Sequence, residues 1–217
     1  FSDHTILMAL VIMFVLLFAT TDRFRSMDNF LSILQEASFI GIAGIGMTFC
    51  IITGGLDLSS GSMIALLAVI NMLLLRATDS FLIIPLVLVL GSLLGAFNGL
   101  LVSKVKIPAF IATLATFYIF RALAYIITGG DPISYNAPWF IWIGNGKIFG
   151  IPFSFILMIA LAFLAHLLLR RTKIGRTVVA IGNSPEASRI SGLNNDLATI
   201  FAFLMVGLNV AISSVLL

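Results

Sequence analysis

Long apolar runs separated by short polar connections dominate the chain. The runs cover roughly residues 5–20, 38–53, 62–75, 81–103, 108–127, 151–169 and 197 onward. Most of them approach the roughly 20 apolar residues that a helix needs to cross a bilayer. They are also too long and too uniformly apolar for the alternating pattern of a membrane β-barrel. The pattern therefore predicts an all-α, polytopic membrane protein with about seven transmembrane helices.

The stretch before the second run has a different pattern. In FRSMDNFLSILQEA, apolar residues at positions 27, 30, 31 and 34 recur at helical spacing, opposite polar residues at positions 28, 32 and 35. Such a stripe is typical of a helix that lies along the membrane interface. We therefore expect an interfacial amphipathic helix over residues 24–36, separate from the span that follows.

Composition agrees with the membrane assignment, since 60% of the residues are hydrophobic and 10% are charged. No polar stretch is long enough to build a separate soluble core, so we expect one transmembrane domain over residues 1–217. The chain begins with Phe1 and ends within an apolar run. We therefore expect a fragment of a longer protein, truncated at the C-terminus and at the N-terminus.

The basic residues indicate topology rather than a nucleic-acid partner, because they are scattered along a chain of net charge +3. The densest basic stretch, RRTKIGR at residues 170–176, is expected on the cytoplasmic side. With seven spans, that places the N-terminus in the cytoplasm and residues 128–150 outside. The inverted topology is the alternative.

A polar, glycine-rich stretch, GGLDLSSGS at residues 54–62, interrupts two short apolar runs. It predicts a broken helix near residues 53–62, which a bilayer tolerates only where protein or a water-filled path shields the backbone. Such breaks can bind polar solutes through free amides and carbonyls. Asp57 can cap the next helix, while Ser59 and Ser60 keep the break polar. Direct contact of Asp57 with solute and a solvated loop remain alternatives.

The run over residues 108–127 carries a charge deep in the apolar region, Arg121. Intramembrane charges are costly and are therefore functional candidates. Arg121 shares about half of the helix surface with three residues that could line a path for a polyol: Thr113, Phe117 and Phe120.

A structural role for Arg121 is an equal alternative, with the side chain reaching the interface or pairing with Asp131 or Asp57. Asn98 is an uncharged polar residue within a span. Such residues commonly hold helices together, and Asn98 is also a candidate for the translocation pathway.

Three glycines at helical spacing, Gly91, Gly95 and Gly99, allow close approach of another helix. We expect this packing within the chain, and a dimer face is the alternative.

The polar stretch over residues 170–196 contains start and stop signals for a short helix. Ser184 can cap it, Pro185 suits its first position, and Glu186 suits its first turn. The helix would continue through Ala187 and Arg189 and stop at Gly192. A short, exposed helix between spans can transmit force from a docked partner, whereas a basic loop on anionic lipid is the alternative.

Signals of catalysis are missing from the sequence. It has no phosphate-binding loop, no paired Cys or His spacing and no nucleophile elbow. We therefore expect no catalytic, metal or cofactor site, and any ATP hydrolysis would take place in another subunit.

Three stretches, in this order, resemble the permease subunits of ribose-type sugar ABC importers, a family that also serves xylose, galactose, galactofuranose and autoinducer-2. They are GIGMTFCIITGGLDLSSGSMIAL, NGLLVSKVKIPAFIATLATFYIFRALAYIITGG and RRTKIGRTVVAIGNSPEASRISGL. The resemblance implies ATP-driven import of a monosaccharide or similar polyol by alternating access across the bacterial inner membrane.

The resemblance also implies partners: a second permease copy or paralogue, two cytosolic ATP-binding subunits, an external solute-binding protein and membrane lipid. Residues 184–192 would be the coupling helix on the ATPase. Two alternatives remain, namely an ABC permease for a nucleoside or branched-chain amino acid, and an ion-coupled secondary transporter. The latter would need a relay of carboxylates, and Asp57 alone lies near the membrane interior.

Overall fold

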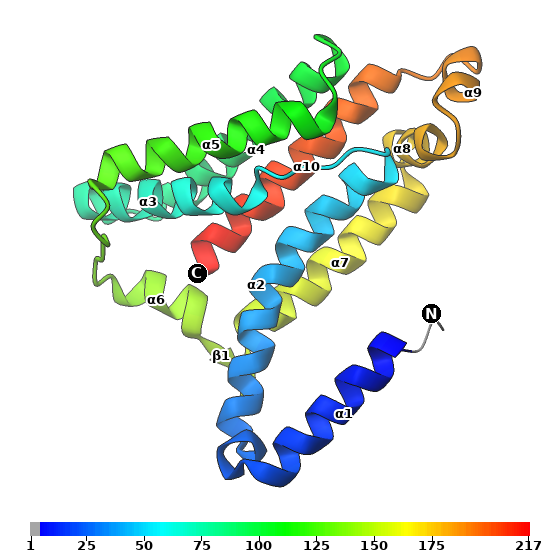
Figure 1. The fold of residues 1–217 in the computed structure, drawn as a ribbon. Helices are drawn as coiled ribbons and strands as arrows, with labels where there is room; N and C mark the ends of the chain where they lie inside the picture. Colours follow the sequence, from blue (N-terminus) through cyan, green and yellow to red (C-terminus); the bar gives the residue numbers. More distant parts are fainter. Residues whose placement is uncertain (1–4) are drawn as a thin grey trace.

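The computed structural model describes residues 5–217, which form helices joined by short connections (Figure 1). The elements, in chain order, are α1 (Thr5–Thr20), η1 (Asp22–Arg25), α2 (Met27–Ile52), α3 (Ser60–Thr78), α4 (Ile83–Ser103), α5 (Ala109–Thr128), α6 (Pro138–Asn145), β1 (Lys147–Ile148), β2 (Ile151–Pro152), α7 (Phe153–Arg171), α8 (Lys173–Asn183), α9 (Pro185–Ile190) and α10 (Asn195–Leu216). The strands β1 and β2 form a two-residue antiparallel hairpin.

Six helices in this part of the chain are long and apolar enough to cross a membrane, namely α2, α3, α4, α5, α7 and α10. Helix α1 is also apolar but has only 16 residues. The architecture confirms a polytopic helical membrane protein.

The prediction of a separate interfacial helix over residues 24–36 is wrong. Helix α2 is continuous over 26 residues from Met27, and the Ser26 side chain caps its start by accepting from Asn29 N. Neither glycine nor proline interrupts the chain between this stretch and the span, so the helix continues. Gln35 on the polar stripe donates to Gly144 O at 3.0 Å, so part of that stripe contacts α6.

Helix α10 is the central helix of the fold and packs against α2, α3 and α4. Its closest approach is to α4, where glycines face each other. A Cβ on Gly91 would lie 2.7 Å from Gly207 O, and one on Gly99 would lie 2.8 Å from Ile200 Cα. The glycines of α4 therefore serve packing within the chain.

The two ends of the bundle carry different elements (Figure 1). Helices α8 and α9 lie at one end, hereafter the α9 end, and α6 lies at the opposite one, the α6 end. At the α6 end, Trp139 Nε1 donates to Asp79 Oδ1 at 2.9 Å, and its ring lies 4.2 Å from that of Phe81. These contacts tie α6 to the turn between α3 and α4.

Helix α8 lies in the polar stretch over residues 170–196, where the sequence predicts only the short helix at residues 184–192. It contains two glycines. Both glycines allow close packing: a Cβ on Gly175 would lie 2.6 Å from Leu169 Cα, and one on Gly182 would meet the backbone of Ile52. Val178 and Ile181 are buried beneath the helix. The residues 173–183 therefore form an amphipathic helix held against α2 and α7.

Candidate functional site

Helical structure is interrupted between two membrane-spanning helices, as the sequence predicted. Helix α2 ends at Ile52 and α3 begins at Ser60, and residues 53–59 are not helical. Gly54 has a φ of +79°, in the left-handed region that glycine adopts without steric cost. Gly55 N donates back to Cys50 O at 3.0 Å, so the end of α2 is closed before the chain continues.

Asp57 and Ser59 bury their side chains in this break, and they are 2% and 0% exposed. Asp57 Oδ1 accepts from Ser59 N at 2.8 Å and from Ser59 Oγ at 2.6 Å. The N-cap of α3 is Ser59, so Asp57 is not the N-cap. The carboxylate instead accepts a hydrogen bond from the Ser59 amide, just before the first turn of α3. This bond fixes the backbone that leads into the helix.

Side chains from two other helices join this pair. Asn98 of α4 donates from Nδ2 to Ser59 Oγ at 2.9 Å. The Oγ1 hydroxyl of Thr113 on α5 shares its one proton between Leu56 O at 3.1 Å and Ala109 O of its own helix at 2.8 Å. Four side chains, the break cluster, therefore connect the break to α4 and α5: Asp57, Ser59, Asn98 and Thr113.

Two acceptors of the break cluster have no donor among residues 5–217, namely Asp57 Oδ2 and Asn98 Oδ1. Buried polar atoms in proteins nearly always have a hydrogen-bond partner. Both oxygens are buried inside the cluster, so a solute could reach them only if the surrounding side chains moved apart.

The other predicted pathway residues lie outside this cluster. Ser60 is half-buried at the start of α3, and Phe117 is half-buried on α5. Phe120 is 4% exposed and belongs to the main hydrophobic core.

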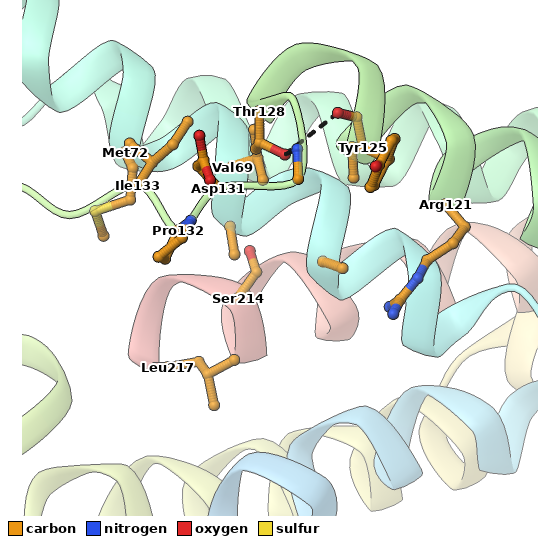
Figure 2. A pocket seen from close by; sticks show the side chains of 14 residues that line it. Val69, Met72, Arg121, Tyr125, Thr128, Asp131, Pro132, Ile133, Ser214 and Leu217 are labelled. Atoms are coloured by element: carbon orange, nitrogen blue, oxygen red, sulfur yellow. Dashed lines mark hydrogen bonds between the residues drawn. The ribbon is translucent and has the colours of Figure 1, made fainter.

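Arg121 lies on a cavity of about 500 Å³ between α3, α5 and the end of α10. Figure 2 shows its side chain at one end of the cavity and Asp131, beside Pro132, at the other. Arg121 forms no ion pair within residues 5–217, so pairing with Asp131 or Asp57 is not observed. Its side chain is exposed to the cavity instead.

The cavity combines a guanidinium, a carboxylate, hydroxyl groups and an aromatic ring, which are groups that bind polar solutes. Tyr125 and Thr128 follow Arg121 on the same face of α5, a spacing that the sequence alone could have revealed. Asp131 and Ser214 join them only through the fold, since Ser214 lies on α10. In the part of the chain that the structure describes, no three His, Cys, Asp or Glu residues gather as a metal site would require.

Helix α9 forms as the sequence indicated. Ser184 Oγ accepts from Ala187 N at 3.2 Å, Pro185 is the first helical residue, and Gly192 has a φ of +74°. Glu186 and Arg189 are exposed.

Helix α9 is tied to α10 through one side chain, Asn195. Its Nδ2 donates to Pro185 O at 2.8 Å, and its Oδ1 accepts from Ser188 Oγ at 2.7 Å. The next residue, Asp196, pairs with Lys104 and Lys106 of the turn between α4 and α5. No local pattern in the sequence predicts these pairs, because about 90 residues separate the partners.

A polytopic helix bundle with a polar helix break inside it is an architecture that transport proteins use, since irregular backbone at membrane depth occurs where it is shielded or lines a cavity. The chain matches, over residues 29–217, the family described as the branched-chain amino acid transport system permease component. It therefore belongs to this family of permeases.

Curated relatives carry the names of sugar permeases, which confirms the resemblance seen in the sequence. The ribose import permease protein of Haemophilus influenzae is 38% identical over 92% of this chain and 63% of its own length. The ribose import permease protein of Escherichia coli K12 is 31% identical over 97% of this chain and 67% of its own length. The L-arabinose transport system permease protein of Escherichia coli K12 is 33% identical over 100% of this chain and 66% of its own length.

The chain thus spans about two thirds of the length of these relatives. No solved structure matches it.

Proposed function

We propose that the chain is part of the membrane-spanning subunit of an ATP-driven importer of a monosaccharide or similar polyol. The observation that carries the proposal is the break cluster, in which buried Asp57 and Asn98 each retain a free acceptor oxygen. Sugars are rich in hydroxyl donors that such acceptors bind. The relatives named for ribose and L-arabinose import support the same class of substrate.

The charges support an orientation with the α9 end in the cytoplasm of a bacterium. Four basic residues surround the α7–α8 junction: Arg170, Arg171, Lys173 and Arg176. Positive charge near the ends of spans favours the cytoplasmic side. The N-terminus would then be cytoplasmic too, and α6 would lie outside the inner membrane.

In this orientation, solute would enter from the α6 end. The cavity around Arg121 would receive it first, and the break cluster lies closer to the α9 end. A transported molecule must leave the site as well as enter it. The polar break would therefore supply only a few hydrogen bonds, which do not trap the solute. Alternating access would open the Arg121 cavity to the outside first and the break cluster to the α9 end afterwards.

Helix α9 is the candidate contact for an ATP-binding subunit. It is short and exposed, and Asn195 holds it on α10. Force applied to α9 would therefore reach the central helix of the bundle. We propose two ATP-binding subunits, a second permease copy or paralogue and an external solute-binding protein as partners.

A branched-chain amino acid is the competing substrate, because one cavity holds both an unpaired guanidinium, Arg121, and a carboxylate, Asp131. A zwitterion has the complementary charges. Neutral sugars would use the same groups as hydrogen-bond donors and acceptors.

The test is uptake by the complete transporter in proteoliposomes, with the full-length permease, its ATP-binding subunits and its solute-binding protein. We expect uptake of radiolabelled ribose, arabinose or galactose that requires ATP inside and stops with vanadate. Leucine serves as the control substrate. Uptake of leucine but of no sugar, or uptake driven by a proton or sodium gradient without ATP, would overturn the proposal.

A further inference from the structure

The carboxylate of Asp196 binds two lysines that come from the same short turn. Its Oδ2 lies 2.8 Å from Lys104 Nζ, and its Oδ1 lies 3.0 Å from Lys106 Nζ. Each oxygen therefore serves one lysine. The pairs join the first turn of α10 to the turn over residues 104–108, which leads from α4 into α5.

The turn has an unusual backbone at one of these lysines. Lys106 has a φ of +65°, in the left-handed region that residues with a Cβ seldom adopt. Such strain persists where surrounding contacts hold the conformation in place. The bond from Ile107 N to Leu101 O at 3.2 Å is such a contact, and the exposed Lys106–Asp196 pair adds a weaker one.

The same turn forms one wall of a second cavity, of about 310 Å³. Residues 53–55 of the helix break form another wall, and Thr199 and Phe203 of α10 contribute a third. The turn, the break and α10 therefore enclose this cavity on three sides. A turn that moves away from α10 would widen this cavity.

Helix α9 is one residue away from the ion pairs. Asn195, which holds α9 by two hydrogen bonds, precedes Asp196 directly. From the turn, α5 leads to Thr113 and its bond to Leu56 O in the break. Contacts thus run without interruption from α9 to the break cluster.

We propose that Lys104, Lys106 and Asp196 form a latch, which holds the turn over residues 104–108 against α10 and opens when α9 moves. The source of that movement rests on the proposed ATP-driven function, whereas the latch itself does not. The three residues are positioning residues: they set the place of the turn and touch no solute.

The exposure of the three side chains suits a latch that must open. Lys104 is 59% exposed, Lys106 is 70% exposed and Asp196 is 31% exposed. Ion pairs with this exposure are weak and are screened by salt. A buried pair of the same geometry would resist opening, since breaking it would leave an uncompensated charge.

The test measures access to the second cavity in the complete transporter, without nucleotide. A cysteine placed at Thr199 on α10 reports access, in a background in which the native cysteines, including buried Cys50, are replaced by alanine. A membrane-impermeant maleimide labels it from the α9 end. We expect Asp196→Asn to raise the labelling rate roughly two- to thirtyfold, the range that two exposed pairs allow.

Further variants separate the latch from a general loss of structure. Lys104→Gln with Lys106→Gln leaves the start of α10 intact and should raise labelling as Asp196→Asn does. Asp196→Glu should restore slow labelling. High salt should speed labelling of the parent reporter protein, with its latch intact, and should leave the rate of Asp196→Asn unchanged, which a purely structural role for Asp196 would not produce.

Lys173→Gln is the matched control, because this lysine lies at the same end and forms no ion pair within residues 5–217. Unchanged labelling in Asp196→Asn and in the double lysine variant would overturn the latch, and so would an equal rise in Lys173→Gln. Sugar uptake is measured separately. An absence of ATP-driven uptake by the unmodified transporter would overturn the proposed function, while labelling would still decide on the latch.

Discussion

The contact between α4 and α10 gives the sharpest prediction about stability. A Cβ on Gly207 would lie 2.9 Å from Gly91 C and 2.9 Å from Gly95 N, and would meet Gly91 O more closely still. These neighbours are backbone atoms, which no side-chain rotation can move aside. Because carbon atoms prefer separations near 3.5–4.0 Å, the helices would have to separate by about 1 Å.

Such overpacking should lower the free energy of unfolding of Gly207→Ala by about 3 kcal/mol. For a chain of 217 residues, that corresponds to a fall in Tm of about 6–12 °C, and the fall is smaller in the longer full-length permease. The matched control is Gly44→Ala in α2, because a Cβ there has no neighbour within 4 Å. The Tm of both variants is measured by heating the detergent-solubilised full-length permease and quantifying the protein that remains folded by size-exclusion chromatography. A Gly207→Ala protein as stable as the control would refute the packing argument.

Three further predictions concern side chains at the two ends of the bundle. Arg121→Ala should reduce sugar uptake and leave Tm nearly unchanged, since Arg121 forms no ion pair within the described residues; a large fall in Tm would indicate a structural role instead. Glu186→Lys should leave the permease inserted but lower the sugar moved per ATP hydrolysed, because Glu186 is exposed on α9; an unchanged ratio would remove α9 from coupling. Trp139→Phe should lower the stability by about 1 kcal/mol, since it removes the hydrogen bond to Asp79, and Trp142→Phe, which has no such bond in residues 5–217, is the control in the same thermal assay.

Several local features of the sequence correctly predicted local structure. Ser184, Pro185 and Gly192 delimit α9 because caps and stops act over three or four residues. The helix break over residues 53–59 follows from glycines and polar residues between apolar runs. The roles of the break and of α9 in transport remain predictions.

Other local signals were incomplete or misleading. The amphipathic stripe of residues 24–36 continues into α2, because nothing in the chain ends the helix there. The sequence predicts no helix over residues 173–183, and the structure shows that Gly175 and Gly182 let α8 pack closely against neighbouring backbones.

The sequence by itself determined the class of protein and the place of its polar break, because hydrophobic length and capping are properties of neighbouring residues. Only the tertiary structure decided which polar groups meet. Asn98 reaches Ser59, and Thr113 reaches Leu56 O, because α4 and α5 pack beside the break. Asp196 meets both lysines across about 90 residues of sequence, and no local pattern encodes a contact of that kind.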